Sequence, residues 1–343
     1  MSNDWTFQDR TVVVTGGTGS IGSAIVEALV GHGPRAIRVV SRDDSKQFEL
    51  AQRLRSANGL RFLIGDVRSR TRMERALAGA DFVFHAAAMK HVPAAEFNPF
   101  EATETNVRGT QNVVEAAIDN GVQRVLAIST DKAVDPTNVM GATKLLTERL
   151  MSAAEFYKGA TPTRFASVRF GNVIGSRGSL VPLIRGQVAR GGPVTITDPE
   201  MTRYLMPIGD AVQLCLAAMG QMSGGEVFIL KMPRVRVGDL VEVLIEAYAP
   251  QFGFRPAEIA IETIGTRSGE KAHEMLMTAE EAARADVTAD MFIVPPVGRD
   301  GVAASPAHDR PPEPAAPVLG RDAVRELVDA AGWLRPEILP SMG

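Results

Sequence analysis

The sequence predicts an α/β protein with a doubly wound parallel sheet and a smaller C-terminal domain. Three observations lead to this fold class. Short β-branched runs alternate with helical periodicity from residue 11 to residue 169, which is the pattern of consecutive βαβ units. A glycine-rich segment joins the first run to the first helical stretch, and the alternation loosens after residue 171. The first part is therefore expected to form one sheet with right-handed crossovers.

The elements of the first part follow from residue type and spacing. Residues 11–15 are threonine and valine, and β-branched side chains favour a buried strand. Ile21, Ala24, Ile25 and Leu29 recur at helical spacing, which predicts a helix over 21–31. The same reasoning predicts strands at 36–40, 61–64, 81–85, 124–129 and 165–169, and helices at 48–56, 102–120 and 139–156.

Later elements are spaced less regularly. We expect helices near 181–189, over 210–222 and over 237–249, and a short strand at 226–230. Residues 297–319 are rich in proline and alanine, which predicts a flexible linker before a final helix within 320–343. The predicted domains are 1–171 with 204–231 for the sheet, and 172–203 with 232–296 for the smaller domain.

Composition limits the class of protein. The chain has 343 residues and a formal charge of −3, which gives no reason to expect a nucleic-acid or anionic-membrane partner. No run of 18 uncharged apolar residues occurs, so we expect no transmembrane helix. The single cysteine, Cys215, lies in an apolar run and cannot form an internal disulfide, which favours the cytoplasm.

The segment Thr15 to Gly22 has the spacing Gly-x-x-Gly-x-x-Gly and lies between a predicted strand and a predicted helix. The first glycine permits a tight turn, the second lets a pyrophosphate approach the backbone, and the third lets the helix pack on the strand. This context predicts a Rossmann dinucleotide site, whereas the alternative is a structural turn. The predicted contacts are Gly16, Thr18, Gly19, Ser20, Ile21 and Gly22.

The end of the second strand indicates which dinucleotide binds. An Asp or Glu about 20 residues beyond the turn would bind the ribose 2′-hydroxyl of NAD. The chain instead has Ser41, Arg42 and, one turn later, Lys46. Two cations suit the 2′-phosphate of NADP; the alternative is that they are solvated surface charges. Asp66 and Val67 are placed to contact the adenine, although Asp66 equally suits a turn.

Several further motifs follow the glycine turn. They are Ala86-Ala-Ala-Met-Lys-His-Val-Pro-Ala-Ala-Glu96, Asn98-Pro-Phe-Glu101, Thr130-Asp-Lys-Ala133, Arg169-Phe-Gly-Asn-Val-Ile-Gly-Ser-Arg-Gly178, Met201-Thr-Arg203 and Arg267-Ser-Gly-Glu-Lys271. With the glycine turn and Asn106, they resemble the extended short-chain dehydrogenase/reductases, and within them the UDP-N-acetylglucosamine 4,6-dehydratases in a short form. The resemblance spans roughly residues 9–276. It implies homo-oligomers, which are usual in that family, and cofactor contacts from Ala86, Ala87, Ala88 and Asn106.

The resemblance implies a lyase that uses NADP to oxidise C4 of UDP-N-acetylglucosamine, eliminates water from C5 and C6, and returns hydride to C6. It implies that Asp131 is the acid at the C6 oxygen, that Lys132 is the base at C5, and that Lys144 binds the nicotinamide ribose. Met140 occupies the position of the usual superfamily tyrosine, a replacement that a subset of these dehydratases shares. Another group must therefore take the 4-hydroxyl proton: Thr130 with Lys144, Asp131 or an ordered water.

Substrate contacts are expected at the sheet edge and in the smaller domain. Lys90 and His91 follow the fourth strand, and arginine forks suit a pyrophosphate. The histidines form no metal-ligand spacing, so no metal site is expected. With the alternative that each is a surface or capping residue, the predicted substrate contacts are Lys90, His91, Asn172, Val181, Pro182, Thr197, Arg203, Arg267 and Glu270.

Two other functions fit part of this pattern. A nucleotide-sugar 4-epimerase would use the same fold, but it has no use for an acid and a base at C5 and C6. A catalytically silent NADP-binding regulator would account for Met140, but the retention of Asp131, Lys132 and Lys144 argues against it. Retention or inversion at C5 depends on geometry that a sequence does not give.

Overall fold

The structure, a computed structural model, describes residues 5–298 and 316–335. Within these ranges the chain divides into two compact units. The first unit comprises residues 5–169, 212–230 and 276–298, and the second comprises 170–211, 231–275 and 316–335. Most of the predicted linker at 297–319 and the last part of the predicted C-terminal segment, 336–343, lie outside the described residues.

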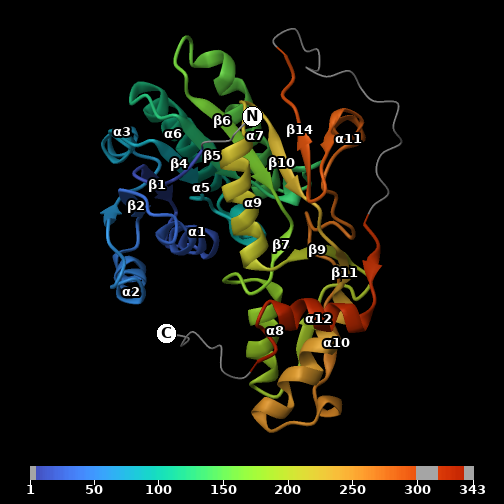
Figure 1. Cartoon of the computed structure of the whole chain (residues 1–343). Helices are drawn as coiled ribbons and strands as arrows, with labels where there is room; N and C mark the ends of the chain where they lie inside the picture. The colour runs from blue at the N-terminus through green and yellow to red at the C-terminus, as the bar shows by residue number, and fades with distance from the viewer. Residues whose placement is uncertain (1–4, 299–315, 336–343) are drawn as a thin grey trace. The chain divides into compact units, whose positions relative to one another are not determined.

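The first unit is built on a nine-stranded sheet of order β13-β14-β10-β6-β5-β4-β1-β2-β3, which confirms the doubly wound fold. Figure 1 shows this order from β2 at the left to β14 at the right. Seven strands are parallel, and β14 and β13 are antiparallel additions at one edge. The strands are β1 (Thr11–Thr15), β2 (Ala36–Ser41), β3 (Leu60–Ile64), β4 (Phe82–His85), β5 (Arg124–Ile128), β6 (Arg164–Arg169), β10 (Val227–Leu230), β13 (Asp286–Val287) and β14 (Met291–Val294).

Helices connect these strands because every parallel pair needs a crossover. Every residue of β1 is buried, as expected for a parallel strand that is covered on both faces. The order of the strands reverses direction at β1 and β4, and ligands of such sheets bind where this reversal occurs. The helices are α1 (Ser20–Val30), α2 (Asp44–Arg53), α3 (Arg70–Leu77), α4 (Val92–Phe97), α5 (Pro99–Thr103), α6 (Gly109–Asp119), α7 (Val139–Tyr157), α9 (Ile208–Gln221) and α11 (Ala279–Arg284), with a π-helical turn at Glu104–Arg108 and a 3₁₀ turn at Asp131–Ala133.

The second unit has two small sheets, β15-β11-β9-β7 and β12-β8. Its apolar core lies among α8, α10, α12 and the strands, with Tyr248 and Val241 fully buried. Its strands are β7 (Asn172–Val173), β8 (Val194–Ile196), β9 (Thr202–Met206), β11 (Arg234–Arg236), β12 (Ile261–Thr263) and β15 (Val318–Leu319); its helices are α8 (Leu180–Val188), α10 (Val237–Tyr248) and α12 (Arg321–Ala330), with 3₁₀ turns at Pro250–Phe252 and Pro256–Glu258.

The units differ from the predicted domains chiefly at 204–211 and 276–296; residues 170–171 and 231 and the described C-terminal segment 316–335 also belong to the second unit. Residues 204–211 belong to the second unit, because β9 runs unbroken through residue 204 and pairs with β7 and β11. Residues 276–296 belong to the first unit, because the apolar strand β14 pairs with β10. No helix in the described ranges is both long enough and apolar enough to cross a membrane.

Candidate functional site

The glycine turn after β1 leaves no room for side chains. Gly16 has a φ of +64°, and a Cβ there would lie 2.6 Å from the backbone nitrogen of Ala87. A Cβ on Gly22 would lie 2.2 Å from the carbonyl oxygen of Gly16. In the described chain no side chain caps the N-terminus of α1, which begins at Ser20. A helix N-terminus of this kind has free backbone N–H groups and a positive dipole end, and both suit a phosphate.

His85 joins the strands beside this turn through a directed chain of hydrogen bonds. Thr110 Oγ1 donates to the Asn106 carbonyl at 2.6 Å, so its oxygen accepts from His85 Nε2 at 3.1 Å. The His85 proton is therefore on Nε2, and Nδ1 accepts from Thr15 Oγ1 at 2.7 Å. Burial lowers the pKa of His85 to about 3, and the charge of Lys144 acts in the same direction. This neutral ring fixes β1, β4 and α6 relative to one another.

Asn106, predicted to contact the cofactor, lies in the π-helical turn between α5 and α6. Its side-chain nitrogen donates to the Met89 carbonyl at 3.0 Å and to Thr143 Oγ1 at 2.9 Å. Its side-chain oxygen accepts from the Met89 amide at 2.7 Å. Both amide protons are engaged, so Asn106 anchors the segment that contains Ala86, Ala87 and Ala88. π-Helical turns inside helices often occur at functional sites.

The residues predicted to select the dinucleotide follow β2. Ser41 is buried, and its hydroxyl accepts from Gln47 Nε2 at 3.1 Å. Arg42 is mostly exposed and lies 3.8 Å from the Asp66 carboxylate. Lys46 is half-exposed and pairs with Asp43. Both cations are therefore at the surface beyond β2, each beside one carboxylate.

The two residues predicted to face the adenine have separate structural contacts. Asp66 accepts from the Arg68 backbone amide and from two Arg68 guanidinium nitrogens. Burial works to raise the pKa of Asp66, but the Arg68 hydrogen bonds and charge and the charge of Arg42 hold it below its usual range. Val67 is buried, and its carbonyl accepts from Asn112 Nδ2 at 2.9 Å.

Asp131 is fully buried directly after β5. Its Oδ1 accepts from Thr130 Oγ1 at 3.0 Å and from Lys132 Nζ at 2.9 Å. Its Oδ2 is also buried but has no hydrogen-bond partner among the described residues. A buried carboxylate oxygen without a partner costs free energy. Asp131 lies at the carboxyl edge of the sheet, which is where ligands of such sheets bind.

Met140 and Lys144 are both buried on α7. Met140 is 4% exposed and packs against alanines of α4 and α5 in an apolar cluster. Lys144 is 7% exposed and donates from Nζ to the Ile128 carbonyl at the end of β5. Burial lowers the pKa of Lys144 to about 8, although Glu148 acts in the opposite direction. Lys144 therefore loses its proton more readily than an exposed lysine does, whereas Met140 has no proton to exchange.

Lys90 and His91 lie beyond β4, which is the neighbour of β5 in the sheet. Both are exposed, and His91 is the N-cap residue of α4. Partial burial and the charge of Lys90 lower the pKa of His91. The structure therefore places these two predicted residues at the same sheet edge as Asp131.

In the second unit, one cluster of residues surrounds Arg203. Its other members are Thr197, Met201, Arg267 and Glu270. The Arg203 guanidinium donates to Glu270 Oε1 at 2.9 Å and to Met201 Sδ at 3.2 Å. Thr197 Oγ1 lies 3.5 Å from the same Glu270 oxygen. Glu270 Oε2 is buried without a partner among the described residues. Arg267 is exposed and contributes its carbonyl to the Glu270 amide.

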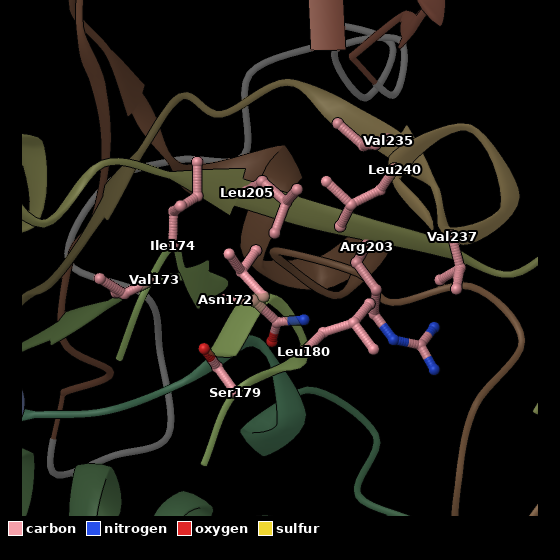
Figure 2. A pocket seen from close by; sticks show the side chains of 11 residues that line it. Asn172, Val173, Ile174, Ser179, Leu180, Arg203, Leu205, Val235, Val237 and Leu240 are labelled. Carbon is pink, nitrogen blue, oxygen red and sulfur yellow. The ribbon is translucent and has the colours of Figure 1, made fainter. Parts of the chain in front are cut away.

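Asn172, Val181 and Arg203 line a small cavity of about 20 Å³, shown in Figure 2. This volume holds about one water molecule. Ser179 also lines the cavity, and its buried Oγ has no partner in the described chain. The remaining lining residues are apolar side chains. Within the described ranges, Pro182 and Arg267 are not among the lining residues.

Sequence reasoning missed the buried polar residues that support the site. Arg169 forks to Glu148 at 2.6 Å and to Glu281 at 2.8 Å, with all three largely buried. An arginine at the end of the apolar run 165–169 was a visible signal. Glu281 gave no such signal, because it meets Arg169 only through the fold.

The chain matches a family described as polysaccharide biosynthesis protein over residues 12–296. An uncharacterized membrane protein of Methanocaldococcus jannaschii is 53% identical over 295 residues, 86% of this chain and 88% of that one. A UDP-N-acetylglucosamine 4,6-dehydratase (inverting) of Campylobacter jejuni is 42% identical over 278 residues, 80% of each chain. A UDP-glucose 4-epimerase of Rickettsia rickettsii is 43% identical over 298 residues, 86% of this chain and 85% of that one.

A solved structure extends the similarity to the fold. The X-ray structure of Pen from Bacillus thuringiensis is 41% identical, with a TM-score of 0.90 over 96% of this chain and 100% of that one. This coverage includes residues of both units. Relatives with two activity names, dehydratase and epimerase, thus have almost the same identity to this chain.

Proposed function

Because this chain belongs to the polysaccharide biosynthesis protein family, we propose that it catalyses NADP-dependent 4,6-dehydration of UDP-N-acetylglucosamine. The observation that carries this proposal is the fully buried Asp131, whose Oδ1 is paired with Lys132 and whose Oδ2 has no described partner. An adjacent acid and amine at a ligand-binding sheet edge provide the two proton carriers that elimination of water needs. The 42% identical dehydratase of Campylobacter jejuni supports the same reaction.

The turn after β1 fits a dinucleotide. At Gly16 and Gly22 a Cβ would collide with backbone atoms of the chain itself, which is the tight turn and the close helix–strand packing of a dinucleotide-binding turn. Arg42 and Lys46 would face the 2′-phosphate of NADP, and Lys144 would bind the nicotinamide ribose. When bound, NADP supplies a reversible hydride acceptor.

Asp131 and Lys132 would divide the elimination between them. Transfer of one proton along their 2.9 Å hydrogen bond, from Nζ to Oδ1, converts the ion pair into a carboxylic acid and a neutral amine. The acid protonates the departing C6 oxygen, and the amine takes the C5 proton as the C5–C6 double bond forms. Water leaves, and the original ion pair is restored.

The 4-hydroxyl requires a different proton acceptor, because Met140 packs in an apolar cluster and carries no exchangeable proton. We favour Lys144, whose burial lowers its pKa to about 8. Thr130 Oγ1 donates to Asp131 and accepts from the Lys132 amide at 3.4 Å, which leaves one lone pair to accept from a substrate hydroxyl. In this arrangement Thr130 positions the hydroxyl and Lys144 exchanges the proton.

The second unit would hold the UDP part. Arg203 is largely buried and keeps its guanidinium on Glu270, which gives a fixed fork for a diphosphate. Asn172 and Val181 line the neighbouring cavity. Glu270 and Thr197 would contact the ribose side of the nucleotide.

A UDP-glucose 4-epimerase is the second candidate, because a 43% identical relative has that name. An epimerase returns hydride to C4 and exchanges no proton at C5. The buried Asp131–Lys132 pair has no role in that chemistry, which favours the dehydratase.

Proton NMR of the purified protein with UDP-N-acetylglucosamine in D₂O tests the proposal. Dehydration produces a C6 methyl group with deuterium at C5, and the coupling constants give the C5 configuration. A new C4 epimer without deuterium at C5 would establish the epimerase instead. An unchanged spectrum, repeated with added NADP⁺, would favour another nucleotide sugar or the silent regulator.

A further inference from the structure

The C-terminal helix α12 lies beyond residues 12–296, the part of the chain that the family match covers. It packs within the second unit, where Figure 1 shows it beside α10. Its Val324 and Val328 are fully buried in the core of that unit. Arg321 pairs with Glu242 at 2.8 Å across the two helices. This helix is therefore an integral part of the second unit.

The residues after α12 hold Trp333 in one place. The Trp333 amide donates to the Val328 carbonyl at 3.1 Å. Its carbonyl accepts from Tyr248 Oη at 2.6 Å, and the next carbonyl, of Leu334, accepts from Gln251 Nε2 at 3.1 Å. The backbone of Trp333 is thus fixed by two hydrogen bonds, to α12 and to α10, and the next residue is fixed by a third to the turn after α10.

The indole of Trp333 covers Gly175. Gly175 has a φ of +73°, and a Cβ there would lie 1.9 Å from Trp333 Cε2. Only glycine fits this position, because both the backbone conformation and the ring exclude a side chain. The contact joins the C-terminal segment to the loop between β7 and α8.

That loop is short, and residues in it and beside it line the cavity in Figure 2. Its turn is held by hydrogen bonds from the Ser176 amide to the Val173 carbonyl and from the Ser179 amide to the Ser176 carbonyl. Asn172, in β7 just before the loop, and Ser179, its last residue and the N-cap of α8, both line the cavity. The Ser179 Oγ is buried without a described partner, so it is oriented to bond a ligand or a water molecule.

We propose that Trp333 is a positioning residue for this loop: α12 presses its indole against Gly175, and this contact sets where Asn172 and Ser179 meet the UDP moiety. The proposal rests on the proposed function, since it takes the loop to bind UDP. It gives the C-terminal helix a role in nucleotide recognition.

Calorimetric titration of the full-length protein with UDP tests the contact between Trp333 and Gly175, with one variant at each of the two residues. We expect Trp333→Ala and Gly175→Ala to weaken UDP binding about tenfold, a loss of ~1.4 kcal/mol, because each variant alters the contact that positions the loop. NADP binding is expected to stay unchanged in both variants, and Trp333→Phe to recover most of the affinity. Phe252→Ala is the matched control, because it removes another partly buried aromatic ring that packs on the same core.

Intrinsic fluorescence gives a second measurement that needs no truncation of Trp333. The chain has two tryptophans, Trp5 and Trp333, so Trp5→Phe leaves Trp333 as the single reporter. We expect UDP to change its emission with the same dissociation constant that calorimetry gives. This readout remains available if Trp333→Ala does not fold.

The outcomes separate the two proposals. If the wild-type protein binds no UDP and converts no UDP-sugar, the proposed function fails and this inference fails with it. If the wild type binds UDP but Trp333→Ala and Gly175→Ala bind it equally well, only the inference is overturned. Unchanged Trp333 emission at saturating UDP would overturn it too.

Discussion

At the scale of single residues, the site combines buried groups whose hydrogen bonds are complete with a few that are not. His85 and Asn106 satisfy their polar atoms within the fold, so they hold the surrounding backbone. Asp131 Oδ2 and Ser179 Oγ are buried without described partners. Incomplete groups of this kind cost folding stability, and they are the groups that a bound substrate would satisfy.

Replacement of Asp131 by asparagine tests the acid at the C6 oxygen. Asparagine keeps the shape and the hydrogen bonds but supplies no acidic proton, so we expect elimination to slow by ~10²–10⁴-fold. NADP binding should stay unchanged, because Asp131 lies beyond β5 and away from the glycine turn after β1. NMR detection of the C6 methyl group measures the rate. Turnover equal to wild type would remove Asp131 from this role.

Lys144 predicts a specific dependence of stability on pH. Its pKa falls from 10.5 in the unfolded chain to about 8 in the folded protein, because burial disfavours the charged form. Between these values the unfolded chain binds more protons at this site, so the free energy of unfolding rises with pH, by roughly 3 kcal/mol across the window. Below pH 8 this contribution is absent.

Denaturant unfolding at pH 7, 8 and 9.5 measures this rise in wild type and in Lys144→Met. The variant should lose the increase, while a change of the exposed Lys46 to Met should keep it. If Lys144→Met and wild type gain stability equally, the folded-state pKa of Lys144 is not depressed.

At the scale of elements, local sequence predicted the strands that are buried on both faces. β1 was expected at 11–15 and occupies Thr11–Thr15. A run of β-branched threonine and valine residues favours a buried extended strand. The expected helix over 102–120 contains α5, a π-helical turn and α6. The π turn places Asn106 against Met89, a tertiary contact that periodicity does not show. β14 was missed because its strand character depends on pairing with the distant β10.

The junction of β2 and α2 carries a prediction of cofactor preference. Arg42 and Lys46 are the cations at this junction proposed to meet the 2′-phosphate, and each has a carboxylate nearby. The double variant Arg42→Ala with Lys46→Ala should weaken NADP binding by about 10–100-fold, as expected for the loss of charge-assisted bonds of ~1.5–3 kcal/mol. NAD binding should change little, and titration of both dinucleotides measures the ratio. Equal losses for NADP and NAD would show that these cations do not recognise the phosphate.

At the scale of the whole molecule, the chain forms two units with separate cores. The sequence predicted the unit to which each motif belongs. Thr130, Asp131 and Lys132 follow a strand of the sheet and were assigned to the first unit, whereas Arg203 lies beyond residue 171 and was assigned to the second. It assigned residues 276–296 to the smaller domain, whereas β14 and the Arg169–Glu281 ion pair, which form only on folding, join them to the first unit. The cavity beside Asn172 was equally hidden, since it is enclosed by strands and helices far apart in sequence.

This division predicts that two ligands protect two different sets of amides from hydrogen exchange. NADP should slow exchange in the first unit, around the glycine turn and residues 86–88, because the proposed cofactor contacts lie there. UDP should slow exchange in the second unit, over 172–181 and β9. A ligand at 100 times its dissociation constant stabilises the state it binds by about 2.7 kcal/mol, which is ample for detection by mass spectrometry. Protection by UDP confined to the first unit would contradict the assignment of Arg203 and Asn172 to the nucleotide.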